Sequence, residues 1–285
     1  MPTPGAATED HSGWKDGADA TGCPRPGRLA RALRICRVGL CFVYFGVGAW
    51  LLGATLLPLV TLARLRGVSE DASTRRMQRV AHLFYRSFMV VMERVMRVCE
   101  VQWVNAEALT RGPALIVVNH PSLIDTPLLG SKLPQADFLV GREWMSNRWM
   151  QRAIVATGYL NATDGSAVVR TAAERLRAGR TVVIYPEGSR SPLEGLRPFQ
   201  RGAAHIALEV GCDILPVTLQ VTPRVLMKGQ AWTRYPLENP VWRVEVGEPI
   251  RTPVGPAGKE RVLAARRLTA VLEETLRKES ERGRS

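Results

Sequence analysis

The chain has 285 residues, enough for one large hydrophobic core, and its formal net charge of +13 at pH 7 is carried mainly by arginine. Such a charge favours an anionic partner: a nucleic acid, a membrane surface or a phosphate-bearing substrate. Aromatic residues make up only 6% of the chain and no zinc-finger or helicase pattern is present, so nucleic acid is not expected as a partner. The five scattered cysteines and four histidines show neither a C-x-x-C pair nor metal-ligand spacing, which argues against a disulfide framework and predicts no metal site.

The N-terminal third contains a long apolar stretch between two groups of arginines. Residues 1–34 have no apolar period, and we expect a disordered tail with a basic end. Residues 35–104 are expected to form a membrane-associated helical region, because the run Val38–Leu62 is uncharged and long enough to cross a bilayer. Its glycines and Pro58 also allow a bend and a return to the same face, so a single span and a re-entrant segment both stay open. A buried helix of a soluble protein is the third alternative, and the arginines on both flanks leave the orientation open.

An amphipathic, cationic segment, Met77–Val104, follows this run. Its apolar residues recur at helical spacing. This spacing predicts a helix that lies either among lipid headgroups or on the surface of the soluble domain.

Residues 105–285 alternate between strand-like and helix-like segments, which predicts an α/β domain with a mostly parallel sheet flanked by helices. The expected strands are Ala114–Asn119, Ala136–Val140, Thr181–Tyr185, Asp213–Gln220 and Trp242–Val246. The expected helices are Leu123–Leu133, Ser146–Thr157, Ser166–Ala178, Gln200–Val210 and Gly258–Glu279.

The segment Asn119–Asp125, Asn-His-Pro-Ser-Leu-Ile-Asp, directly follows the first of these strands. Open α/β sheets place their chemistry at such strand ends. Five residues of a regular helix turn through about 500°, so His120 and Asp125 can meet only if His120 precedes a helix whose first turn holds Asp125. Pro121 favours such a helix start. In that geometry the carboxylate orients one ring nitrogen and leaves the other to take a proton. A strand-end histidine beside a helix-start acid is the simpler alternative.

The segment Glu187–Arg190, Glu-Gly-Ser-Arg, follows another expected strand. Gly188 allows a ligand to approach the backbone closely, and Arg190 can bind a carboxylate or phosphate with two parallel hydrogen bonds. Ser189 is not expected to be a nucleophile, because no G-x-S-x-G elbow surrounds it. An ordinary polar turn with a surface ion pair is the alternative.

Together these segments resemble the motifs of the glycerolipid acyltransferase superfamily, typified by 1-acylglycerol-3-phosphate acyltransferase. Four matches in chain order carry the resemblance: N-H-x4-D at Asn119, His120 and Asp125, E-G-[ST]-R at Glu187–Arg190, a segment similar to F-[KR]-x-G-A at Phe199–Ala203, and one similar to I-x-P-V at Ile214–Val217. The resemblance covers about residues 100–250. A membrane-associated helical N-terminus is also typical of the family.

The resemblance implies transfer of a fatty acyl group from acyl-CoA or acyl-carrier protein to a lipid hydroxyl, with lysophosphatidate or a related lysolipid as the acceptor. It implies that His120 is the general base and that Asp125 orients its ring. It assigns substrate binding to Asn119, Glu187, Gly188, Ser189, Arg190 and Arg201. No acyl-enzyme is expected, and no cofactor beyond the thioester co-substrate.

One departure bears on the acceptor. Family members that act on lysophosphatidate usually carry a G-x-I-x-I-D-R motif, whose arginine helps to bind the phosphate. The matching segment here, Gly158–Gly165, contains no arginine. Arg142, Arg190 and Arg201 are the candidates to replace it, and we expect lysophosphatidate to be either a weaker acceptor than in typical members or not the preferred one.

The expected location is the inner membrane, with the catalytic domain facing the cytoplasm, where thioester donors reside, and with membrane lipids as partners. Two other functions stay open: a lipid ester hydrolase, and a non-catalytic membrane-binding protein of the same fold. Formation of an ester from a thioester and a lysolipid separates the first from an acyltransferase. The His120–Asp125 pair argues against the second.

Overall fold

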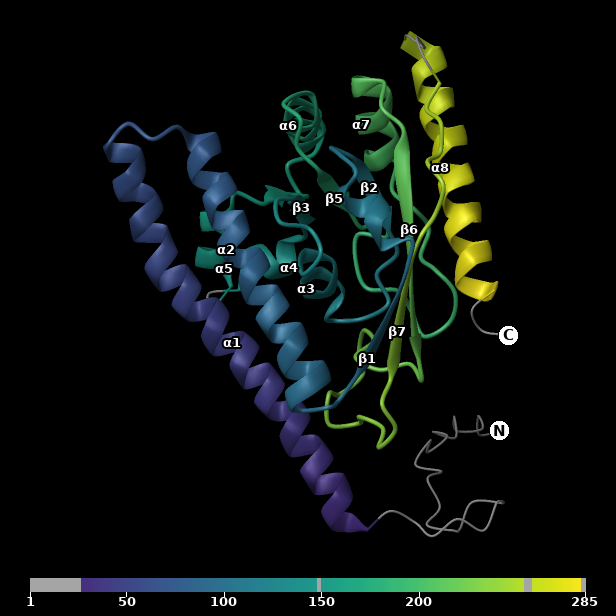
Figure 1. Cartoon of the computed structure of the whole chain (residues 1–285). Coiled ribbons are helices and arrows are strands. Elements are labelled where there is room, and N and C mark those ends of the chain that lie inside the picture. The colour runs from purple at the N-terminus through teal and green to yellow at the C-terminus, as the bar shows by residue number, and fades with distance from the viewer. Residues whose placement is uncertain (1–26, 148–149, 254–257, 283–285) are drawn as a thin grey trace, which may run out of the picture.

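The computed structural model describes residues 27–147, 150–253 and 258–282 of the chain (Figure 1). The first part of the expected tail, residues 1–26, lies outside the described residues. Residues 28–34, also expected in that tail, are helical and open the first helix, α1 (Arg28–Leu65).

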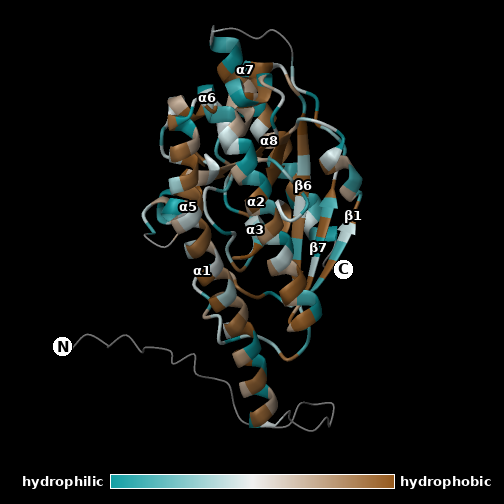
Figure 2. Ribbon diagram, turned by 60° about the vertical axis from the view of Figure 1, so that its left-hand side comes forward, coloured by the Kyte–Doolittle hydropathy of each residue, from teal (hydrophilic) through white to brown (hydrophobic). Residues whose placement is uncertain are grey.

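Helix α1 is continuous, and Pro58 lies within it without ending it. It pairs with α2 (Glu70–Val90), which begins where the Ser69 hydroxyl accepts the amide of Ala72, with Glu70 and Asp71 in the first turn. Along α1, one stripe of residues is buried, at spacings of three and four apart from one gap of eight: Arg34, Val38, Cys41, Ala49, Gly53, Leu56 and Val60. This stripe faces the rest of the protein, and the remaining faces of α1 are largely apolar and exposed (Figure 2).

The buried Arg34 fixes the first half of α1 to the folded domain. Its guanidinium donates to the backbone oxygens of Arg97, Val98, Pro236 and Glu238 and to Oδ1 of Asn239, at 2.8–3.2 Å. A guanidinium carries five N–H groups, so this one side chain can bind two separate chain segments at once. The segments lie directly before the first strand and directly before the last one.

A seven-stranded sheet forms the centre of the molecule, in the order β1-β7-β6-β2-β5-β3-β4. The strands are β1 (Glu100–Val104), β2 (Leu115–Val118), β3 (Asp137–Val140), β4 (Leu160–Asn161), β5 (Val182–Ile184), β6 (Ile214–Thr222) and β7 (Val241–Val246). Every neighbouring pair is parallel except β6 and β7. The prediction of a mostly parallel sheet flanked by helices is confirmed.

The amphipathic segment expected to run as one helix from Met77 to Val104 is divided in the structure. Helix α2 ends at Val90, a π-helical turn covers Val91–Val95, and Glu100–Val104 is an edge strand. The helical prediction for residues 100–104 is therefore wrong. β1 pairs in parallel with β7, and this pairing overrides the helical spacing of its apolar residues.

Helices cover both faces of the sheet (Figure 1). Along β2, Ile116 and Val118 belong to a core shared with α1, α2 and α3 (Asp125–Gly130), whereas Leu115 and Val117 belong to a core shared with the helices of the other face. Those helices are α6 (Ser166–Arg177), α7 (Gly202–Val210) and α8 (Gly258–Arg282). The helix expected at Ser146–Thr157 is present only in its second part, as α5 (Gln151–Thr157), which packs against α1. A separate short helix, α4 (Arg142–Met145), precedes the expected range.

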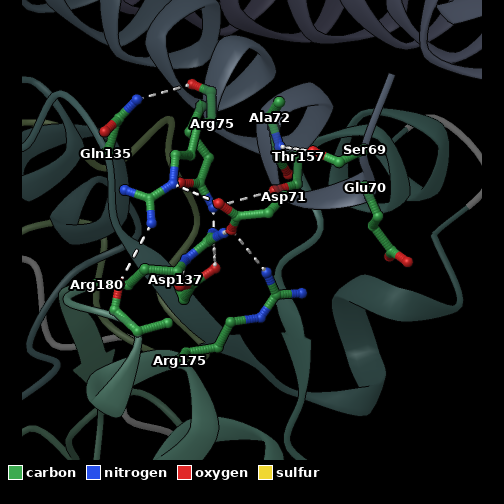
Figure 3. Close-up of polar contacts among 12 residues, drawn as sticks. Ser69, Glu70, Asp71, Ala72, Arg75, Gln135, Asp137, Thr157, Arg175 and Arg180 are labelled. Carbon is green, nitrogen blue, oxygen red and sulfur yellow. Dashed lines mark hydrogen bonds and ion pairs between the residues drawn. The ribbon is translucent and has the colours of Figure 1, made fainter. Parts of the chain in front are cut away.

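An ion-pair network joins α2 to the amino-terminal ends of β3 and β5 (Figure 3). The buried Arg180 donates Nε and Nη2 to the two oxygens of Asp137, at 2.6 Å each, and Nη1 to Asp71 of α2. Asp137 is fully buried and also accepts the Gln78 amide at 3.0 Å. Hydrogen bonding from Arg75, with Arg180 adding to it, lowers the pKa of the Asp71 carboxyl.

The opposite, carboxyl edge of the sheet brings three loops together. β2 lies between β5 and β6 and is parallel to both, so the segments that follow these three strands leave the sheet at the same edge. They are the Asn119–Asp125 segment, the Glu187–Arg190 segment and a loop that begins at Pro223.

Candidate active site

His120 and Asp125 meet at the carboxyl end of β2, as the sequence predicts. The Nδ1 atom of His120 lies 2.8 Å from Oδ2 of Asp125, which is the first residue of α3. The Asp125 side chain is fully buried, whereas the His120 side chain is 15% exposed. An ionised carboxylate can only accept, so Nδ1 carries the proton in this pair and Nε2 is left with a lone pair. The arrangement can accept a proton at Nε2 and stabilise the resulting imidazolium.

Asp125 is held from a second side by Ser122. The backbone amide of Ser122 donates to Oδ2 at 2.7 Å, and its hydroxyl donates to Oδ1. The indole N–H of Trp242, on β7, donates to that hydroxyl at 3.0 Å. Ser122 and Trp242 are both fully buried, so this chain of bonds fixes the carboxylate away from water.

Tyr185, the residue after β5, covers one side of the histidine. Its ring stacks on the imidazole with centroids 4.3 Å apart and planes 26° apart. Burial, reinforced by the Asp125 carboxylate, raises the pKa of Tyr185 well above its ordinary value, so the phenol stays neutral. Its hydroxyl lies 3.1 Å from Oγ1 of Thr126. The ring thus limits the directions from which the imidazole can be reached.

Glu187 ties the two predicted segments to each other. Its Oε1 accepts the backbone amide of His120 at 2.9 Å and the hydroxyl of Ser191 at 2.7 Å, and its Oε2 accepts the amide of Arg197 at 2.9 Å. The amide of Ser191 in turn donates to the His120 carbonyl at 2.7 Å. Glu187 is only 5% exposed, and both oxygens of its carboxylate accept hydrogen bonds from protein groups. These bonds fix the backbone of His120.

Asn119 joins β2 to β6. Its Nδ2 donates to the Leu219 carbonyl at 2.8 Å and its Oδ1 accepts the Leu219 amide at 2.7 Å. The side chain is buried, and these two bonds satisfy both ends of the amide.

Ser189 and Arg190 lie on the solvent side of Glu187 and are partly exposed. Gly188 adopts a φ of +66°, and a Cβ there would lie 2.3 Å from Nε2 of Gln200, so glycine is required for the turn. Arg201, the last predicted site residue, is exposed beside Gln200 at the start of α7. The structure thus groups seven of the eight predicted residues around one edge of the sheet and leaves Arg201 at its rim.

The loop after β6 also contributes to this edge. The carbonyl of Leu226, a residue with a φ of +58°, accepts the amide of Leu123 at 3.2 Å and Nη1 of Arg190 at 3.0 Å. The same Nη1 lies 3.3 Å from the Met227 carbonyl. One turn of the third loop is therefore bonded to both predicted segments.

A cavity of about 330 Å³ opens between the three loops. Asn119 and Pro121, the neighbours of His120, line it together with Ser191 and Met227. Its volume is within the range usual for small-molecule sites, roughly 300–1,000 Å³. The cavity thus lies against the neighbours of His120, whereas His120, Asp125, Ser189 and Arg190 do not line it.

Several residues of this site carry no motif in the sequence. Ser122 lies inside the first motif at a position that the motif does not specify, and Tyr185 is the end of an apolar strand. Trp242 and Leu226 come from segments distant in the sequence. Only the sheet order, which places β6 beside β2 and β7 beside β6, brings these segments to the motifs.

Comparison with known proteins agrees with this geometry. A model of the acyltransferase family matches residues 100–220. The lyso-ornithine lipid O-acyltransferase of Pseudomonas aeruginosa is 30% identical over 197 residues, which is 67% of this chain and 69% of that enzyme. The 1-acyl-sn-glycerol-3-phosphate acyltransferases of Cocos nucifera and Escherichia coli are 28% and 27% identical over 116 and 125 residues. Those matches cover 38% and 50% of the two enzymes, and 38% and 41% of this chain.

The fold has a solved counterpart. The crystal structure of the 1-acyl-sn-glycerophosphate acyltransferase PlsC from Thermotoga maritima superposes with a TM-score of 0.63 at 21% identity, covering 90% of this chain and 97% of that one. The superposition shows a common fold. The family match, the long alignment with the Pseudomonas enzyme and the His120–Asp125 pair lead to one conclusion: this chain belongs to the acyltransferase family.

Proposed function

We propose that this protein transfers a fatty acyl group from acyl-CoA or acyl-carrier protein to the hydroxyl of a lysolipid at a membrane surface. The observation that carries the proposal is the bond between His120 Nδ1 and the buried Asp125, which leaves Nε2 to act on a substrate.

In this mechanism Nε2 of His120 removes the proton of the acceptor hydroxyl as its oxygen attacks the thioester carbonyl. Asp125 stabilises the imidazolium that forms. The tetrahedral intermediate then expels the thiolate by breaking the C–S bond, and the imidazolium returns the proton to the leaving sulfur. Acceptor and donor react directly, so no acyl-enzyme forms.

The contacts support different roles for the eight residues predicted to form the site. Glu187 and Asn119 hold the backbone that carries His120, so we assign them positioning rather than substrate contact. Ser189 and Arg190 are partly exposed beside them, and we assign these two to the polar headgroup of the acceptor.

The acceptor we propose is a lysolipid whose headgroup contains an anionic group, either the carboxylate of lyso-ornithine lipid or the phosphate of lysophosphatidate. The curated relatives act on one or the other. In the segment that lacks the expected arginine, Asn161 forms a tight turn by accepting from Thr163 and donating to Asp164. Because this turn offers a carboxylate and no cation, we propose that lysophosphatidate is not the preferred acceptor.

The membrane contact we propose is the outer face of α1. This helix is the one among the described residues that is long and apolar enough to cross a membrane, and only 22% of its most apolar window is buried. Its exposed large apolar residues are Leu29, Leu33, Leu40, Val43, Tyr44, Val47, Trp50, Leu51, Leu59, Leu62 and Leu65.

We propose that α1 lies along the membrane rather than across it. Its buried stripe packs on α2 and α5, so a transverse orientation would carry the arginines of α2 into hydrocarbon. Arginines at both ends of α1 suit an anionic leaflet. Because acyl thioesters are cytoplasmic, we place the domain on the cytoplasmic side of the inner membrane.

The test is a set of three variants assayed with a thioester and a lysolipid panel, with products identified by mass spectrometry. His120→Ala should abolish ester formation. Asp125→Asn should reduce it by orders of magnitude, as in serine-protease triads, where the equivalent change costs about 10⁴-fold. His205→Gln, a half-buried histidine on α7, is the matched control and should keep full activity.

Circular dichroism and liposome binding check that all three variants fold and bind membranes as the wild type does, so that a loss of ester formation reports on the chemistry. Near-normal ester formation by His120→Ala would refute the mechanism. Release of free fatty acid without any ester product would identify a hydrolase instead.

A further inference from the structure

We infer that Lys228, on the loop after β6, contacts the acceptor headgroup and supplies the cation that the Gly158–Gly165 segment lacks. This inference rests on the proposed function and specifies one of its binding contacts. The Nζ atom of Lys228 donates to Oγ of Ser189 at 2.8 Å. The ammonium therefore lies beside the segment that we assign to the headgroup.

The loop that carries Lys228 is fixed in place. Val225, Leu226 and Met227 are buried, with 1%, 4% and 2% of their surface exposed. Leu226 keeps a left-handed backbone, which is unfavourable for a branched side chain and persists only where the surroundings determine it. Here its carbonyl accepts from both motif segments, as described above. Gln230 closes the turn by exchanging hydrogen bonds with the Met227 backbone at 3.2 Å.

Two neighbouring cations, Arg190 and Arg197, each use some of their N–H groups for hydrogen bonds within the protein. Nη1 of Arg190 donates to the carbonyls of Leu226 and Met227, and Nε of Arg197 donates to the Arg190 carbonyl at 3.0 Å. Both side chains therefore help to hold the loops. Lys228 is exposed, and its bond to Ser189 uses one of the three protons of the ammonium.

The charge of Lys228 is not neutralised within the described part of the chain, where no carboxylate forms an ion pair with it. A cation held beside a serine hydroxyl and an arginine suits a headgroup with a compact negative charge. A phosphate and a carboxylate share that chemistry.

The test compares Lys228→Ala, Lys228→Gln and Lys228→Arg with Lys259→Ala, an exposed lysine in the first turn of α8. Acceptors with the same acyl chain and different headgroups are used: lysophosphatidate, lyso-ornithine lipid and the uncharged monoacylglycerol. The neutral variants should raise the KM of the preferred anionic acceptor about tenfold or more, the usual worth of a charge-assisted contact. The KM of the thioester and the turnover of monoacylglycerol should stay unchanged, and Lys228→Arg should restore most of the loss.

The acceptor that loses most identifies the headgroup. An unchanged KM for both anionic acceptors, or an equal loss for monoacylglycerol, would overturn the inference. Weaker binding of Lys228→Ala to anionic vesicles at an unchanged acceptor KM would assign the lysine to the membrane surface and also overturn it.

Calorimetric titration of the acceptors in detergent, without donor, separates this inference from the proposed function. If Lys228→Ala binds an anionic lysolipid about tenfold or more weakly than the wild type does, the inference holds even when no transfer occurs. Equal binding by both proteins would overturn it, even if transfer is observed.

Discussion

Asp125 receives three hydrogen bonds, and only one of them comes from His120. The other two come from Ser122, whose hydroxyl also accepts the Trp242 indole N–H. A histidine and an aspartate five residues apart therefore keep their geometry through a residue that lies between them. The ring orientation depends on that serine as well as on the carboxylate.

Ser122→Ala should lower both stability and turnover. It removes one donor from a buried carboxylate and leaves the indole N–H unpaired, which should cost about 1–3 kcal/mol of the free energy of unfolding. The kcat should fall, but less than in Asp125→Asn, because the Ser122 amide still holds Oδ2. Chemical unfolding and steady-state kinetics measure the two effects.

Trp242→Phe is the matched control for this change. It removes the indole N–H but leaves the bond between Ser122 and Asp125 intact, so stability should fall while kcat stays near the wild-type value. If the two variants lose kcat to the same extent, the serine does not act through the carboxylate.

At the scale of elements, α2 is attached to the sheet by charge as well as by apolar packing. Arg180 reaches from the start of β5 to Asp137 on β3 and to Asp71 on α2. The pair with Asp137 is buried, whereas Asp71 and Arg75 are partly exposed. Because the two ion pairs differ in burial, their loss should change the free energy of unfolding by very different amounts.

Arg180→Met should destabilise the protein by about 3–5 kcal/mol, because it leaves the buried Asp137 carboxylate without its cation. Arg75→Met removes a more exposed partner of Asp71 and should cost less than about 1 kcal/mol. Urea unfolding in detergent gives both values, and hydrogen exchange in α2 should rise selectively in Arg180→Met. Similar small losses in the two variants would show that Asp137 is not held by this pair.

At the scale of the whole molecule, the two faces of the sheet have different surroundings. The helices of one face include α1 with its exposed apolar surface, while α8 lies on the opposite side of the sheet (Figure 1). Helix α8 also exposes apolar side chains, at Val262, Leu263 and Val271. These three residues serve as a control for the proposal that the exposed apolar face of α1 binds the membrane.

Replacing Val43, Val47 and Leu51 of α1 together by Gln should release the protein from anionic liposomes, because the apolar area that binds the interface is lost. The same replacement at Val262, Leu263 and Val271 should leave binding intact, and co-sedimentation measures both. Cysteines introduced at Arg28 and Arg66, the two ends of α1, should react with an impermeant maleimide from one side of sealed vesicles. Reaction from opposite sides would show a transmembrane helix instead.

The sequence predicted those parts of the structure that depend on local pattern. The apolar strand-like runs, the apolar run of α1 and the meeting of His120 with Asp125 all follow from neighbouring residues. The helical prediction for residues 100–104 is wrong because pairing with β7, which no local pattern indicates, decides their conformation. Trp242, Leu226, Lys228 and the Arg180 network depend on sheet order, which the sequence pattern did not specify. Which substrate atoms these residues touch stays a prediction.

The hydrogen bonds of Arg34 connect the proposed membrane-facing helix to the loop that lies near His120. Arg34 binds α1 to the stretch Pro236–Asn239, and the same connection between β6 and β7 carries Leu226 and Lys228. The surface proposed to rest on the bilayer and the proposed headgroup contact thus lie on two segments that the Arg34 hydrogen bonds join. In the proposed membrane orientation, the protein then fixes the height of the proposed base, Nε2 of His120, above the acyl chains. Acceptors should accordingly be selected by how far their hydroxyl stands from their tails, as well as by charge.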